Sequence, residues 1–125
     1  MNRIIVAAAA VVTLTAQAEM PVLQFTLFED YARACGQLSG QASVLDAPSV
    51  SGVLVGVLKG GQMKGASEHQ LQMLKIAYQQ GEREGLTRPG SEGMTTSEID
   101  SARQMAVDGI HPLLKQCATI SEYLK

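Results

Sequence analysis

The chain has 125 residues, with 10 Lys and Arg against 12 Asp and Glu, and its formal net charge is −2 at pH 7. This balance lacks the dense positive charge of nucleic-acid-binding proteins. There is no Trp, and 3 Tyr and 2 Phe leave little aromatic surface for stacking on bases or sugars. The length suits one small domain and argues against two.

The N-terminus has the three parts of a secretory leader. Residues 1–3 form a short basic segment, and residues 4–14 are apolar apart from one Thr. Ala16 and Ala18 then provide the small side chains of a cleavage site. We therefore expect a mature chain of 107 residues that begins at Glu19, with nine basic and twelve acidic residues. An uncleaved membrane anchor is the weaker alternative, because the apolar run is about half the length that spans a bilayer. The expected location is periplasmic or secreted, with no stable membrane insertion after cleavage.

Two cysteines, Cys35 and Cys117, remain in the mature chain and enclose 81 residues. Two cysteines in an exported chain usually pair, so we predict one disulfide between them. The alternative is a reactive or metal-binding thiol pair. No C-x-x-C motif and no basic cluster beside either cysteine supports that alternative.

The strongest helical periodicity covers residues 22–45. Apolar side chains recur there at spacings of three and four, as on one face of a helix: Phe28, Tyr31, Cys35, Leu38, Ala42 and Leu45. Gly36 and Gly40 lower the helix propensity, and we expect fraying or a bend near Gly40.

The apolar residues 50–58 are compatible with either a buried strand or a buried helix. A helix is favoured because no partner strand is visible elsewhere. Gly52, Gly56 and Gly60 would then line one face and let a neighbour approach closely, and residues 59–62 are expected to end the element. Whether this segment belongs to the core or forms a dimer seam stays open, and a homo-oligomer is one of the alternatives.

Two capping boxes mark further helix starts. The first has Ser67 at the cap and Gln70 three residues later, and its helix is expected to end near Gly81 or Gly85. In the second, Thr95 and Glu98 have the same relation. It precedes an apolar stripe that continues to the end of the chain, with a kink or a break at residues 109–112: Ile99, Ala102, Ala106, Ile110, Leu113, Cys117, Ile120 and Leu124.

Together these elements predict an all-α fold. We expect a cleaved leader at residues 1–18 and one domain at residues 19–125, a bundle of four to five helices. The Cys35–Cys117 disulfide would join the first helix to the last.

The chain contains no motif that indicates catalysis. No nucleophile with a base, no paired carboxylates, no phosphate-binding loop and no haem-attachment motif occurs, so we expect no enzyme activity and no cofactor. Asp108 and His111, three residues apart, form the most site-like pair, and His69 lies far away in sequence. A metal site would need further ligands and is not expected; a polar pair at a helix joint is the simpler interpretation.

The sequence favours a non-catalytic protein-interaction module whose partner is another exported or envelope protein. The contact is expected in the loop at residues 81–96, where Arg83, Arg88 and Glu92 would lie at its rim. The same segment is equally explained as a plain connection between helices. Two alternatives stay open: an immunity-type inhibitor of a secreted bacterial toxin, which would also be small, exported, helical and disulfide-bonded, and a small-ligand or metal carrier using Asp108 and His111.

Overall fold

The computed structural model describes residues 19–87 and 92–124, and in these ranges it contains helices and no strands. The predicted all-α bundle is therefore confirmed. The leader at residues 1–18 and Arg88 lie outside the described residues. The helices are α2 (Val22–Val44), α3 (Val53–Met63), α4 (Glu68–Gly85), α5 (Thr96–Ala118) and the one-turn α6 (Ile120–Tyr123).

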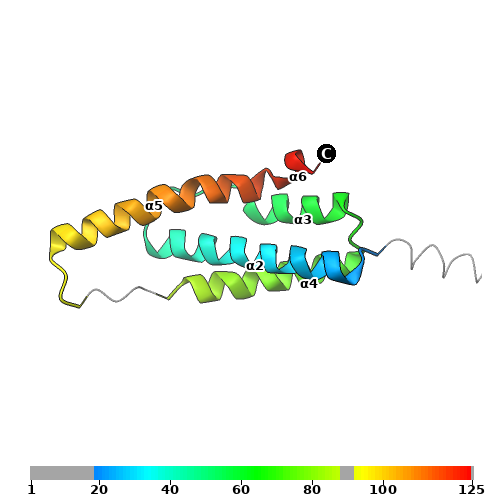
Figure 1. The fold of residues 1–125 in the computed structure, drawn as a ribbon, viewed down its shortest axis with the longest axis horizontal. Helices are drawn as coiled ribbons and strands as arrows, with labels where there is room; N and C mark the ends of the chain where they lie inside the picture. Colours follow the sequence, from blue (N-terminus) through cyan, green and yellow to red (C-terminus); the bar gives the residue numbers. More distant parts are fainter. Residues whose placement is uncertain (1–18, 88–91, 125) are drawn as a thin grey trace, which may run out of the picture.

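The helices alternate in direction along the chain and form two layers (Figure 1). α2 and α4 lie side by side in one layer and run in the same direction. α3 and the C-terminal half of α5 make up the other layer, run opposite to α2 and α4, and are followed by α6. The pair α2–α4 has the most extensive contact in the molecule.

Glycines allow the close packing of α2 and α4. A Cβ atom on Gly36 would collide with the carbonyl oxygen of Tyr78, and one on Gly81 would collide with that of Arg33. Gly40 and Gly85 lie equally close to the backbone of the opposite helix. The two backbones are thus in direct contact along two helical turns, in a packing that only glycine permits.

This packing explains how two glycines lie inside helices. α2 continues without a break through Gly40, where fraying or a bend was expected. α4 passes Gly81 and ends at Gly85, the second of the two ends that the sequence predicted. Both glycines are buried against backbone, so the packing energy of the helix pair outweighs their low helix propensity.

The ambiguous apolar segment is helical. α3 begins after Gly52, whose φ of +77° places it in the left-handed region. It contains Gly60 and Gly61 and ends at Met63, one residue after the stretch 59–62 that was expected to end it. Both glycines are buried, and Gly61 packs against Leu74. Gly56 meets the backbone of Ala118, so α3 belongs to the core in this chain.

Both predicted capping boxes are present. Gln70 N–H donates to Ser67 Oγ over 3.2 Å, and Glu98 N–H donates to Thr95 Oγ1 over 3.1 Å. In each box the third side chain bonds back to the backbone N–H of the cap residue. These bonds satisfy N–H groups that the first turn of a helix leaves without partners.

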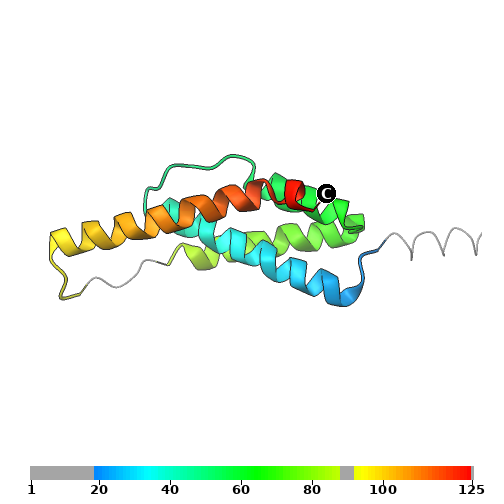
Figure 2. The same cartoon turned by 45° about the horizontal axis from the view of Figure 1, so that its top comes forward.

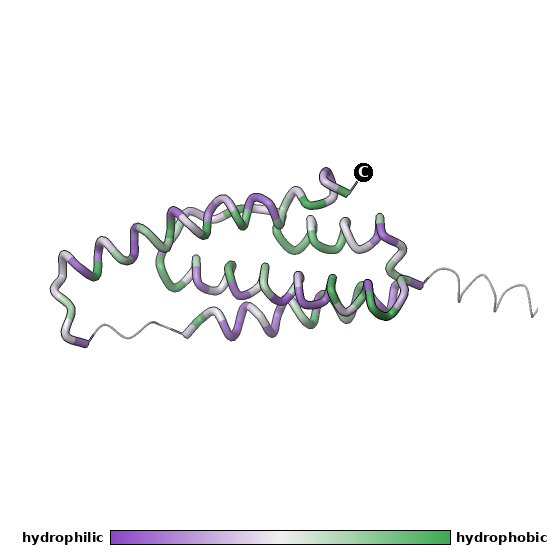
Figure 3. The backbone as a smooth tube through the Cα atoms, viewed as in Figure 1, coloured by the Kyte–Doolittle hydropathy of each residue, from purple (hydrophilic) through white to green (hydrophobic). Residues whose placement is uncertain are grey.

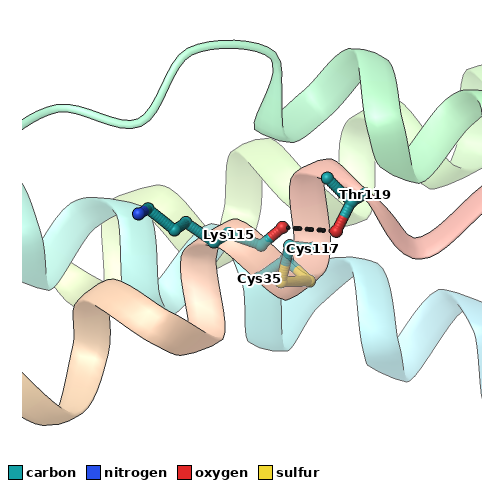
Figure 4. Close-up of a disulfide and its surroundings, with 4 residues drawn as sticks. All are labelled: Cys35, Lys115, Cys117 and Thr119. Carbon is teal, nitrogen blue, oxygen red and sulfur yellow. Dashed lines mark hydrogen bonds between the residues drawn. A yellow bond between two sulfur atoms is a disulfide. The ribbon is translucent and has the colours of Figure 1, made fainter. Parts of the chain in front are cut away.

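α5 is one helix through Pro112, so residues 109–112 do not break it. Proline lacks the N–H that would bond to the carbonyl of Asp108, but Pro112 is exposed and water can reach that carbonyl. The helix ends instead at Thr119, whose hydroxyl donates to the Lys115 carbonyl over 2.9 Å (Figure 4).

The core lies between the two layers and is built mainly from small and medium side chains. Figure 3 shows the hydrophobic residues gathered along the facing sides of the helices. Leu114 is buried while Leu113 is exposed, so the predicted stripe of α5 is displaced by one residue there. The buried set is Met20, Phe25, Ala32, Cys35, Ala42, Val53, Val57, Leu74, Ala77, Tyr78, Ile110, Leu114 and Cys117.

The predicted disulfide is present and links the two layers. Cys35 in the middle of α2 and Cys117 at the end of α5 are 1% and 3% exposed, with their Cα atoms 6.1 Å apart. The bond joins the first described helix to the last long one, since only α6 follows (Figure 4).

Candidate functional site

The N-terminal part of α5 extends beyond the rest of the bundle. Figures 1 and 2 both show it reaching past the C-terminal ends of α2 and α4. Every residue from 96 to 105 is exposed, and the first buried residue of the helix is Ile110. We call residues 96–105 the α5 arm.

One face of the α5 arm continues the apolar stripe that packs in the core. Ile110 is buried and Ala106 is half-buried against the core, whereas Ile99 and Ala102, farther along the same stripe, are exposed. Ile99 is 37% exposed and Met105, on a neighbouring face, is 76% exposed. The sequence pattern is that of a core-facing helix, but the layer that would cover its first turns ends too early.

The charges around the α5 arm are mostly acidic. Between residues 92 and 108 there are four carboxylates and a single basic residue, Arg103. Arg103 is already engaged, because its Nε donates to the carbonyl oxygen of Leu45 over 2.8 Å. The arm therefore presents an apolar stripe that is bordered mainly by negatively charged carboxylates.

Two local interactions hold the α5 arm in place. The Thr95–Glu98 capping box closes its N-terminal end, and the Arg103–Leu45 bond ties its base to the end of α2. Glu98 also places negative charge at the positive end of the helix dipole. No side chain of residues 96–105 is buried, so these two interactions stabilise the arm where tertiary packing is lacking.

Two of the three sequence-predicted contact residues lie in the described structure, one in α4 and one just before α5. Arg83 is exposed in the last turn of α4, where its charge complements the helix dipole. Glu92 is exposed in the approach to α5. Arg88 lies outside the described residues. The arm itself was missed as a contact surface, although Ile99 and Ala102 were correctly placed on one stripe.

Asp108 and His111 do not form a hydrogen-bonded pair in the described structure. The Asp108 carboxylate accepts from Gln104 Nε2 over 2.8 Å. His111 is half-buried, and its Nδ1 has no hydrogen-bond partner among the described residues. Within residues 19–87 and 92–124, no three His, Cys, Asp or Glu side chains lie close enough together to hold a metal ion.

A groove of about 290 Å³ lies between α2 and α4, toward their N-termini from the paired glycines. Its walls combine charged and apolar side chains: Glu29, Asp30, Arg33, Met73, Ile76, Ala77 and Gln80. Arg33 spans the two helices and donates from Nε and Nη2 to the Glu84 carboxylate, over 2.7 and 2.8 Å. These hydrogen bonds lower the pKa of the Glu84 carboxyl.

A second hollow, of about 460 Å³, lies where the connection after α2 passes α5. Three serines and one carboxylate give it hydrogen-bonding groups, and Leu114 gives it one apolar wall. Its lining is Ser39, Ala42, Ser43, Asp46, Ala47, Ser49, Val50 and Leu114. Asp46 adopts a positive φ of 53° in this connection, which Asp tolerates better than most residues.

Among the described helices, none is both long and apolar enough to cross a membrane. Comparison with known proteins adds no relative: no family model matches the chain, and neither the curated proteins nor the solved structures contain a match.

Proposed function

We propose that this protein is exported by cleavage after Ala18 and acts, without catalysis, by binding another exported or envelope protein through the α5 arm. The observation that carries the proposal is the exposed continuation of the core stripe, Ile99 and Ala102, on an arm that none of the other described helices covers.

The energetics of short helices support this proposal. An unpacked helix of about ten residues is marginal in water, since most helical stability in proteins comes from packing an amphipathic face. The α5 arm has such a face and two stabilising end interactions, but no layer against it. A partner that covers Ile99 and Ala102 supplies the missing packing.

The charge of the arm specifies the chemistry of the partner. Glu98 and Asp100 flank the apolar stripe, and between residues 92 and 108 four carboxylates outnumber the single guanidinium, that of Arg103. A partner with an apolar surface bordered by Lys or Arg is complementary. A second copy of this chain would bring the same carboxylates together, so the proposed partner is a different protein. A toxin neutralised by this chain would be one member of that class.

The proposal is tested with a photo-crosslinking amino acid at position 99 in intact host cells. The matched control places it at Leu23 on α2, which is 78% exposed and far from the arm. We expect a single crosslinked protein from position 99 and none of that protein from position 23. The same capture also reports export, because the mature chain should begin at Glu19 by intact mass.

Point variants then separate specific binding from adhesion. Ala102→Asp, made in the chain that keeps the crosslinker at position 99, places an acid on the same exposed stripe, so the fold should persist. We expect it to abolish capture, Leu23→Asp in the same chain to leave capture unchanged, and capture to weaken with added salt. Capture that survives Ala102→Asp, or that is equal from positions 99 and 23, would contradict the proposal.

A further inference from the structure

Met20, the second residue that the structure describes, has both polar groups of its backbone hydrogen-bonded to one side chain. Met20 is 2% exposed. Its N–H donates to Gln70 Oε1 over 2.8 Å, and Gln70 Nε2 donates to its carbonyl oxygen over 2.9 Å. One side chain from α4 thus satisfies both polar groups of a residue 50 positions away. We call this arrangement the Gln70 clamp.

The Gln70 clamp is continuous with the start of α4. Gln70 Oε1 also accepts from Ser67 N–H over 2.9 Å, which is the return bond of the capping box. Both lone pairs of this oxygen are therefore used, and the side chain is buried. Figures 1 and 2 show the start of the described chain beside the N-terminal end of α4. Closing the clamp requires α4 to be formed and docked.

The clamp lies next to the bond that removal of the leader must break. Ala18–Glu19 is the expected cleavage bond, Met20 is the second residue after it, and α2 begins at Val22. A peptidase binds several residues around the scissile bond as an extended, accessible chain. Met20 is buried and hydrogen-bonded on both sides, so the peptidase cannot bind the chain at this second residue after the bond.

We infer that the leader is removed before the domain closes, and that the Gln70 clamp then seals the new N-terminus. In the cleavage step a leader peptidase adds water across the Ala18–Glu19 amide, which leaves a carboxylate on Ala18 and an amine on Glu19. Cleavage acts on the open chain, and folding withdraws Met20 afterwards. The inference rests on the leader assignment made under the proposed function and is independent of the α5 arm.

The test uses the full precursor, purified with its leader intact and its disulfide formed. The folded precursor and the same chain opened by reduction in mild urea are each exposed to purified bacterial leader peptidase in detergent, and cleavage is followed by intact mass. We expect the open chain to be cut at Ala18–Glu19 and the folded chain to resist.

Three variants of the folded precursor test whether the Gln70 clamp causes its resistance to the leader peptidase. Gln70→Met keeps the size and helix propensity but removes the hydrogen bonds to Met20, and it should raise the cleavage rate of the folded precursor by roughly tenfold or more. Gln72→Met, exposed on the same helix, should leave the folded precursor resistant. Ser67→Ala removes the side-chain cap but keeps the clamp and should also stay resistant. Circular dichroism confirms that each variant is folded.

The outcomes are distinguishable. Equal cleavage of the folded and open wild-type precursors overturns the inference, as does a folded Gln70→Met variant that resists like wild type. An open chain that is cut elsewhere, or not at all, overturns the leader assignment and the inference with it. None of these results bears on crosslinking from position 99, which tests the arm separately.

Discussion

At the scale of single residues, the glycines of this chain have opposite roles according to what lies beside them. The sequence offers Gly81 and Gly85 as alternative ends of a helix; α4 ends at Gly85, and Gly81 is a contact point of two backbones inside it. That role depends on Arg33, which is far away in sequence, so no local pattern could reveal it. The clamp between Gln70 and Met20 was missed for the same reason.

Gly81→Ala should destabilise the protein by about 1–3 kcal/mol, because the added methyl group meets the carbonyl oxygen of Arg33 and forces the helices apart. Gly109 is the matched control. It is also inside a helix, but a Cβ atom there meets nothing within 4 Å. Gly109→Ala should therefore stabilise the protein by about 0.5–1 kcal/mol. Urea unfolding measures both, and a loss at Gly109 as large as at Gly81 would contradict the packing argument.

Tyr31 has a buried hydroxyl without a partner among the described residues. Leaving a buried polar group unpaired costs about 1–3 kcal/mol, so Tyr31→Phe should leave stability unchanged or raise it by up to ~1 kcal/mol. Tyr78 provides the comparison, because Ser39 acts on its hydroxyl and lowers the Tyr78 pKa against the larger effect of burial. Tyr78→Phe should cost about 1 kcal/mol. Thermal unfolding of the two variants in parallel decides the matter, and equal losses would mean that Tyr31 has a partner such as bound water.

At the scale of helices, sequence patterns located the starts better than the ends. The two capping boxes fixed the beginnings of α4 and α5 because a cap is a local device of four residues. Pro112 and the Gly60-Gly61 pair look like interruptions in sequence, yet α5 and α3 pass through them. Tertiary packing outweighs propensity there, and packing is not visible in a window of ten residues.

The disulfide is the element-level feature that sequence predicted fully, since both cysteines fall on apolar stripes. Replacing both with alanine should cost about 4–5 kcal/mol if the bond acts mainly by restricting the unfolded chain, given the 82-residue separation. Urea unfolding of the Cys35→Ala/Cys117→Ala chain measures the loss. A change below ~1 kcal/mol would show that packing between the layers is sufficient by itself. Because both cysteines are buried, we also expect the folded protein to resist mild reductants.

At the scale of the whole molecule, the fold class could be predicted from periodicity, but the arrangement could not. No local sequence pattern indicates that α2 and α4 run parallel and touch, or that α5 extends beyond the ends of its neighbours. The candidate surface results from the extension of α5, because its apolar stripe is exposed only beyond the ends of α2 and α4. The sequence predicted the helix lengths to within a few residues. How far one layer is shifted along the other depends on long-range contacts, namely the close contact of Gly56 with Ala118 and the disulfide.

The pH dependence of the whole fold should be steepest on the alkaline side. Burial raises the pKa of both Tyr31 and Tyr78, so the folded state holds these phenolic protons more tightly than the unfolded chain does. Their contribution to stability is complete below the unfolded value of about 10 and is lost as pH rises through the higher folded values. The urea concentration at the midpoint of unfolding should therefore decrease as the pH is raised beyond about 10, while the absorbance of tyrosinate increases. Tyr78→Phe should flatten this fall, whereas Tyr123→Phe, at an exposed position, should not. A midpoint that stays constant while the buried tyrosines ionise would show that they titrate without unfolding the bundle.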